Sequence, residues 1–215
     1  LSELGLSDFF SKEVLLVTTA EPAPISLRSF DEYTGRIAKI NAHRSFFANF
    51  LKMLVEKYEF NVLFLPHTIG PTIDMDDREI AKDILKRANL ENEVTGRCYV
   101  LEDDLSAAEL KGIISKGTML LAERVHSIIG AVGVHTPVMC LASNTDTRVE
   151  GMLKEMAHLE GNIYYLNHPN LTECLALFSK IYANKEVEKA RLTRIDMLFK
   201  DQLACISKTI NYNNL

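Results

Sequence analysis

The sequence predicts an α/β fold of Rossmann type, in which a mostly parallel sheet forms the middle of three layers and helices cover both of its faces. Two observations favour this class. Short apolar runs alternate regularly with segments of helical periodicity along the 215 residues. The apolar runs are also continuous, without alternating polar residues, as is typical of parallel strands buried on both sides.

Each expected element has its own pattern. Apolar runs predict strands at 14–19, 25–27, 61–66, 97–101, 118–122, 137–142 and 162–166. Apolar residues at helical spacing predict helices at 46–60, 74–87, 106–114, 125–132, 148–159, 171–182 and 185–206. The second helix begins with acids and ends with bases, as a helix dipole favours, and Ser106 and Glu109 have the spacing of a capping box.

The domain organisation follows from these elements. We expect a linker that can include a first strand at 1–24, a Rossmann-like domain at 25–183, and an amphipathic helix with a tail at 184–215. Breakers and charges at 20–44 predict a loop, a hinge or a lid. The chain does not begin with methionine, so we expect a fragment of a longer protein.

Composition excludes several classes of function. The net charge of −5 argues against nucleic-acid binding, and no apolar run approaches the roughly 20 residues that span a bilayer. The first residues have no basic region typical of a signal peptide. Four widely spaced cysteines without a CxxC pair predict reduced thiols, so we expect a cytoplasmic protein.

Ligands of open parallel sheets bind beyond the carboxyl ends of the strands. That rule selects Arg28, His67, the acids at 102–104, the group at 123–127 and the segment 143–148. The densest group follows the strand at 118–122 and contains Glu123, Arg124, His126 and Ser127. Unpaired N–H groups at the start of the next helix favour an anion there, and an arginine beside an imidazole supplies charge and a proton.

Two longer stretches carry a family resemblance. The pairing of "LFLPHTIGP…DDRE" with "AERVHSIIGAVGVHTPVMCLAS" resembles the polysaccharide pyruvyl transferase family, whose members have a P-[QH]-x-x-G-P turn before a D-D helix and an R-x-H-[SA] motif before another helix. The similarity covers about residues 25–182. It implies one half of a GT-B-like architecture, namely the C-terminal half that binds the donor, with the N-terminal half missing from this chain.

The resemblance also implies an activity. Such enzymes move a carboxyvinyl group from phosphoenolpyruvate onto two hydroxyls of a sugar in a cell-surface glycan or its lipid-linked precursor, and a pyruvate ketal forms. His126 matches the histidine of R-x-H and is the candidate general acid. The expected donor-binding residues are Arg124, Ser127, Arg28, Glu123, Arg148 and His67. Glu123 is expected to orient Arg124 or pair with it.

Two positions depart from the family pattern. Arg148 stands where members often have lysine, and His67 stands where many have glutamine, so His67 can also serve only to close the turn. We expect no cofactor and no metal. The acids at 102–104 precede the Ser106 cap and are typical of a solvated loop.

Two other functions stay open from the sequence. One is a nucleotide-sugar glycosyltransferase of GT-B fold, for which Glu150 or Glu155 could bind the ribose, although no glycine-rich phosphate loop accompanies them. The other is a non-catalytic binding module, favoured if Arg124 and His126 are locked in an internal ion pair away from any cleft.

Overall fold

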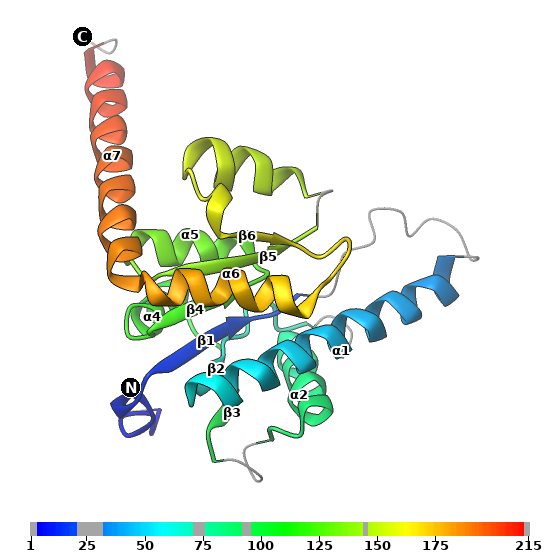
Figure 1. The fold of residues 1–215 in the computed structure, drawn as a ribbon. Helices are drawn as coiled ribbons and strands as arrows, with labels where there is room; N and C mark the ends of the chain where they lie inside the picture. The colour runs from blue at the N-terminus through cyan, green and yellow to red at the C-terminus, as the bar shows by residue number, and fades with distance from the viewer. Residues whose placement is uncertain (1–3, 21–31, 71–75, 92–95, 144–145, 213–215) are drawn as a thin grey trace.

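The computed structural model describes residues 4–20, 32–70, 76–91, 96–143 and 146–212, and it confirms the α/β class (Figure 1). The strands are β1 (Val14–Thr18), β2 (Asn61–Phe64), β3 (Cys98–Val100), β4 (Met119–Ala122), β5 (Val138–Ala142) and β6 (Ile163–Tyr165). The helices are α1 (Glu32–Tyr58), α2 (Asp77–Ala88), α4 (Ala107–Ile114), α5 (Val125–Gly133), α6 (Leu171–Ala183) and α7 (Lys185–Tyr212). Three shorter helical elements are η1 (Phe9–Ser11), η3 (Val149–Met156) and η4 (Glu160–Asn162).

All six strands form one parallel sheet in the order β3-β2-β1-β4-β5-β6. The chain builds outward from β1 to β3, crosses back beside β1, and then builds outward in the other direction from β4 to β6. The junction of β1 and β4 is therefore a topological switch point, the place at which ligands of open α/β sheets usually bind.

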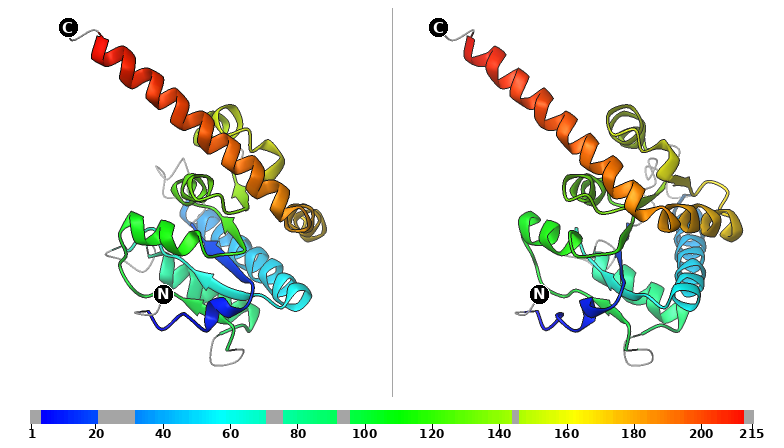
Figure 2. Two further views of the ribbon diagram at one scale, coloured as in Figure 1. Left: turned by 90° about the vertical axis from the view of Figure 1, so that its left-hand side faces the viewer. Right: turned by 60° about the vertical axis from the view of Figure 1, so that its left-hand side comes forward.

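Helices cover both faces of the sheet (Figure 2). The side chains of Leu15 and Val17 in β1 enter a core with α1, α2 and α6, whereas those of Val14 and Leu16 enter a second core with α4, α5 and the start of α7. Every residue of β1, β2, β4 and β5 is buried, so the continuous apolar runs have the cause that the sequence suggested.

Several sequence predictions need correction or stay open. The loop expected at 20–44 is wrong from Glu32 onward, because α1 begins there. Near its start, residues 35 and 37–39 are exposed, including Ile37, so no apolar stripe marked this part of the helix in the sequence. The helix expected at 148–159 is the π-helix η3. The strand expected at 25–27 lies outside the described residues.

The domain boundaries at residues 24 and 183 stay predictions. Strand β1, which lies within the segment 1–24, occupies the middle of the sheet. The capping box of Ser106 and Glu109 is confirmed, with both reciprocal hydrogen bonds present. The four cysteines are free, as expected.

Helix α7 begins against the domain and then leaves it. Leu192 and Ile195 are buried, whereas every residue from 201 to 206 is exposed, and the end of the helix projects past the other elements (Figures 1 and 2). Within the described ranges, no helix is both long and apolar enough to cross a membrane.

Candidate active site

The polar cluster of the sequence lies at the switch point. Thr18 of β1 pairs in register with Ala122 of β4, and the Glu123 N–H donates to the Thr18 carbonyl at 3.0 Å, so the ladder continues one residue past β4. Thr18 and Thr19 are both buried. Glu123 and Arg124 therefore follow directly on a buried sheet edge, and the next residue begins α5.

Arg124 is held by its backbone and its side chain. It is the N-cap residue of α5 with an extended backbone, and its Nε donates to the Thr19 carbonyl at 3.2 Å. Its Nη2 donates to Oδ1 of Asp77. A guanidinium has five N–H donors, and these two contacts use two of them. The side chain is 30% exposed, so the other donors can reach a ligand.

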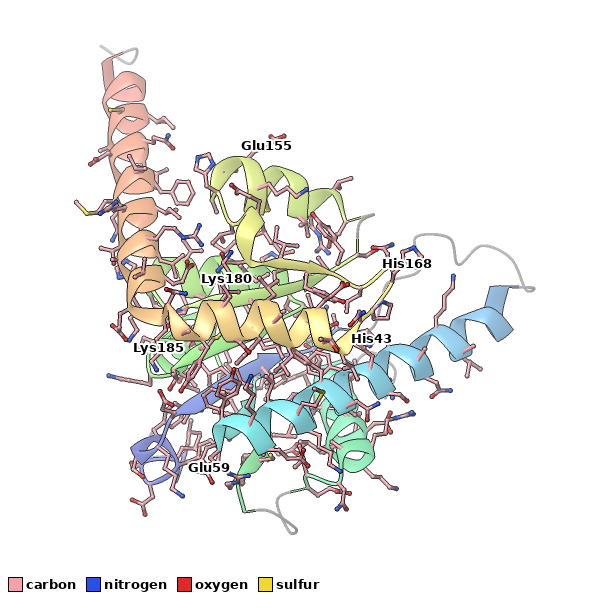
Figure 3. The ribbon with its side chains drawn as sticks, viewed as in Figure 1. His43, Glu59, Glu155, His168, Lys180 and Lys185 are labelled. Atoms are coloured by element: carbon pink, nitrogen blue, oxygen red, sulfur yellow. The ribbon has the colours of Figure 1, made fainter. Side chains whose placement is uncertain are left out.

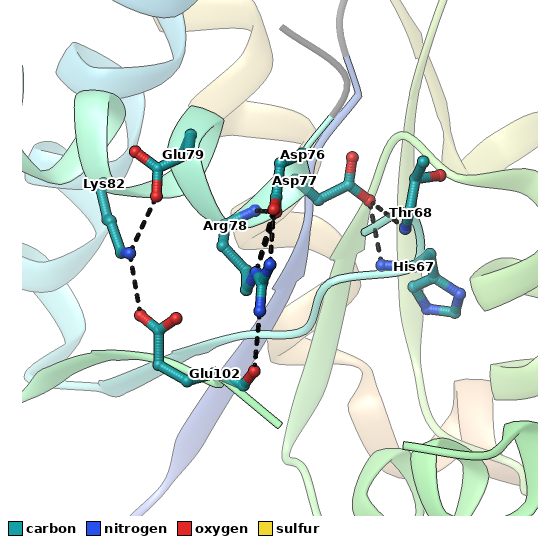
Figure 4. Close-up of polar contacts among 8 residues, drawn as sticks. All are labelled: His67, Thr68, Asp76, Asp77, Arg78, Glu79, Lys82 and Glu102. Atoms are coloured by element: carbon teal, nitrogen blue, oxygen red, sulfur yellow. Dashed lines mark hydrogen bonds and ion pairs between the residues drawn. The ribbon is translucent and has the colours of Figure 1, made fainter. Parts of the chain in front are cut away.

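Asp77 is the partner that the sequence analysis missed. Its side chain is only 1% exposed, and its Oδ2 accepts from the backbone N–H groups of His67 and Thr68 at 3.0 Å each (Figure 4). The DDRE acids were interpreted as residues that open a helix, and Asp76 does cap α2 by accepting from the Arg78 N–H. Asp77 belongs to the same DDRE motif, but the sequence pattern did not indicate that the Asp77 side chain is buried.

His67 enters the site as a neutral side chain. Its Nε2 is buried and has no hydrogen-bond partner among the described residues. The pKa of His67 is lowered below its ordinary value of 6.5, mainly because the ring is buried. The charge of Asp77 raises this pKa, whereas the charges of Arg124 and His126 lower it. Asp77 links the His67 backbone to the Arg124 side chain through its two carboxylate oxygens.

His126 lies in the first turn of α5 and is exposed. Its ring makes no hydrogen bond or ion pair with any residue that the structure describes, so both ring nitrogens can meet a ligand. Arg124 is ion-paired but remains partly exposed, and His126 is free. The condition that would favour a non-catalytic module, both side chains locked inside the protein, is therefore not met.

Glu123 does not pair with Arg124, contrary to one expectation for it. Its Oε1 contacts Nε2 of His43 on α1, which Figure 3 labels, and its Oε2 accepts from the Ala20 N–H at 2.9 Å. The sequence analysis assigned His43 no role, because nothing near it in the chain indicated a partner. Glu123 thus fastens α1 and the end of β1 to the residues that precede α5.

Ser127 is fully buried beneath the same turn. Its hydroxyl donates to the Arg124 carbonyl at 2.6 Å and lies 2.8 Å from the Thr18 hydroxyl. Its N–H also donates to the Arg124 carbonyl, at 3.0 Å. A bond from Ser127 to a ligand would have to replace one of these contacts. What the structure gives Ser127 is support for the backbone of Arg124.

One other expected donor-binding residue makes its contacts elsewhere. Arg148 is exposed and forms its ion pair with Asp146 at 2.7 Å, apart from the contacts around Arg124. Arg28 lies outside the described residues. The acidic loop behaves as expected, since Glu102 is exposed and pairs with Lys82 on α2 (Figure 4).

Comparison with known proteins settles the family. The sequence model described as polysaccharide pyruvyl transferase matches residues 14–145, more than half of the chain, and these residues include the His67 turn, Asp77 and the Arg124–His126 motif. The chain belongs to the polysaccharide pyruvyl transferase family. The predicted resemblance is confirmed, and membership supports a transferase. No curated protein matches the chain.

Solved structures show the same fold at low sequence identity. A protein of Listeria monocytogenes assigned as a UDP-N-acetylglucosamine 2-epimerase is 15% identical with a TM-score of 0.55, over 96% of this pyruvyl transferase family chain and 48% of its own. The S. aureus MnaA structure with UDP is 12% identical with a TM-score of 0.50, over 82% of this chain and 40% of its own. The chain thus spans about half the length of these structures.

Proposed function

We propose that this chain is the donor-binding half of a polysaccharide pyruvyl transferase that uses phosphoenolpyruvate. The observation that carries the proposal is the exposed His126 beside the partly exposed Arg124 at the β1–β4 switch point, within residues that match the family. The alternative donor, a nucleotide sugar, has a weaker basis, because the neighbour solved with UDP shares only the fold.

The charge of the site suits such a donor. The carboxylate and phosphate of phosphoenolpyruvate together carry close to three negative charges. Arg124 offers a planar fork of N–H donors for one of these groups, and the first N–H groups of α5 and its dipole favour the other. His67, neutral because of its lowered pKa, adds a hydrogen-bonding nitrogen without a further charge. Arg28 and Arg148 stay predicted contributors from neighbouring loops.

The proposed chemistry needs one proton donor near the methylene carbon. Protonation of C3 by His126 converts the methylene into a methyl group and leaves C2 electron-poor. Two sugar hydroxyls form C–O bonds to C2, and the C–O bond to phosphate breaks. Of the two hydroxyl protons released, one restores His126 and the other leaves with phosphate. The products are the pyruvate ketal and inorganic phosphate, and the reaction requires no redox partner.

The acceptor belongs to the other half of the enzyme in this proposal. A glycan or lipid-linked sugar would bind to an N-terminal domain and face the Arg124 site across a cleft, in the cytoplasm. The present chain would then bind donor but not turn over. Adding the missing domain would restore transfer.

A thermal-shift titration with phosphoenolpyruvate tests the donor. At a hundredfold Kd, binding adds about 2.7 kcal/mol, which raises Tm by about 5–10 °C for a chain of this size. The double variant Arg124→Ala, His126→Ala should lose the shift. Arg87→Ala, an exposed arginine paired with Asp83 on α2, is the matched control and should keep it. Stabilisation by UDP but not by phosphoenolpyruvate would refute the proposal and favour a nucleotide-sugar glycosyltransferase.

A further inference from the structure

We propose that Asp77 is a positioning residue that holds the Arg124 guanidinium and the His67–Thr68 turn in one fixed arrangement. The inference deepens the proposed function and rests on it for the identity of the ligand. Nothing in the family motif distinguishes Asp77 from the neighbouring acid Asp76, whereas their contacts in the structure are entirely different.

The two oxygens of Asp77 contact different parts of the site. Oδ1 accepts from Arg124, which follows β4, and Oδ2 accepts from two consecutive backbone N–H groups in the turn after β2. A further bond runs from the Asp77 N–H to the Thr68 carbonyl at 3.0 Å. Residues separated by 47 positions are therefore joined through one carboxylate. A shift of either part would break a hydrogen bond of a buried charge.

The contacts also fix the plane of the guanidinium. Nη2 donates to Asp77, and Nε donates to the Thr19 carbonyl. Two bonds to a rigid planar group leave it little freedom to rotate. Both donors on Nη1 remain unused by these two contacts, on a side chain that is 30% exposed. An arginine held in this way loses less conformational entropy when an anion binds.

Burial explains why the arrangement is stable. Asp77 is 1% exposed, and a buried carboxylate must be compensated by charge and hydrogen bonds. Arg124 supplies the charge, and the His67–Thr68 turn supplies two N–H donors. Asp77 has no exposed oxygen with which to contact substrate itself. Its effect on the reaction must act through Arg124 and His67.

The test compares Asp77→Asn with Asp76→Asn. Asp76 is also nearly buried, caps α2 and pairs with Arg78, so its variant loses stability without touching Arg124. Two readouts are taken on each full chain. The first is the Kd for phosphoenolpyruvate by calorimetry. The second is the NMR signal of Arg124 Nε–H, with hydrogen exchange at the His67 and Thr68 amides, which needs no ligand.

We expect Asp77→Asn to weaken donor binding by ten- to a hundredfold, to shift the Arg124 signal and to speed exchange at both amides. Asp76→Asn should leave all three unchanged within about twofold. Asp77→Glu keeps the charge and should recover part of the affinity. If Asp77→Asn does not fold, the same measurements are made on Asp77→Glu. An unchanged Arg124 signal and unchanged amide exchange in the Asp77 variants would overturn the inference.

The two readouts separate this inference from the proposed function. If phosphoenolpyruvate does not bind the parent chain, the proposed function fails, whereas the NMR arm still decides whether Asp77 positions Arg124. If the parent binds and Asp77→Asn binds equally well, the proposed function survives and the positioning role is refuted.

Discussion

Nε2 of His43 lies 2.5 Å from Oε1 of Glu123, although the two residues are 80 positions apart in the chain. Both side chains are nearly buried, with exposed fractions of 9% and 6%. The other carboxylate oxygen of Glu123 accepts from the Ala20 N–H. One side chain next to Arg124 thus holds both a long helix and the end of the central strand.

Glu123→Ala should therefore destabilise the protein by about 3 kcal/mol, because it removes the carboxylate that the His43 ring and the partly buried Ala20 N–H contact. Denaturant unfolding of the parent and the variant measures the difference. Glu79→Ala removes an exposed ion pair with Lys82 and should cost about 0.5 kcal/mol. Equal losses for the two variants would contradict a structural role for the Glu123 contacts.

The pH dependence of stability should reveal His67. Its pKa is lowered in the folded state, mainly by burial, so the unfolded chain binds the proton more readily. The free energy of unfolding should fall as pH drops below the ordinary value of 6.5 toward the folded pKa, and this part of the loss should be absent in His67→Gln. Unfolding curves at pH 8, 6 and 5 for both proteins test the difference. Parallel losses in the two proteins would assign the effect to other groups.

Ser127→Ala should cost about 1–2 kcal/mol, since the variant leaves the buried Thr18 hydroxyl and the Arg124 carbonyl each short of a contact. The comparison is Ser115→Ala, whose exposed hydroxyl donates to the Gly112 carbonyl and which should change stability by less than about 0.5 kcal/mol. Donor affinity measured alongside separates support of the turn from direct contact. A large loss of affinity with unchanged stability would indicate that the hydroxyl binds the donor.

Thiol labelling should distinguish one cysteine from the others. Cys205 is exposed on α7, whereas Cys98, Cys140 and Cys174 are buried, and burial raises the pKa of Cys140 and Cys174 to about 12. We expect one rapid reaction with a thiol reagent in the native protein and three more after unfolding. Rapid native labelling of Cys140, counted by mass spectrometry, would show that the sheet opens beside the site.

Much of the fold could be predicted because burial on both faces leaves a direct trace in the sequence. The runs that became β1, β2, β4 and β5 are apolar at every position or nearly so, and helical spacing marked α5 and α6. The first turns of α1 escaped prediction because they bury little surface, and propensity alone is a weak signal.

Only some residues of the candidate site could be predicted from the sequence. Arg124 and His126 could be proposed from the sequence because strand ends are identifiable there and because both belong to one short motif. Asp77 and His43 were not, since each reaches the cluster through strand order and helix packing rather than through local pattern. The partner of Arg124 was predicted wrongly for the same reason. Sequence proximity favoured Glu123 as the partner of Arg124, whereas the fold brought Asp77 to it.

The adjacency of β1 and β4 has a consequence for biosynthesis. Thr18 and Ser127, which touch beneath the site, are separated by 109 positions, so a ribosome must add most of the domain before they can meet. The strands β1, β2 and β3 can pair earlier, and Asp77 then begins to be buried before its cation exists. A truncated chain that ends before Arg124 would therefore keep the two backbone N–H donors to the Asp77 carboxylate but lack its guanidinium partner.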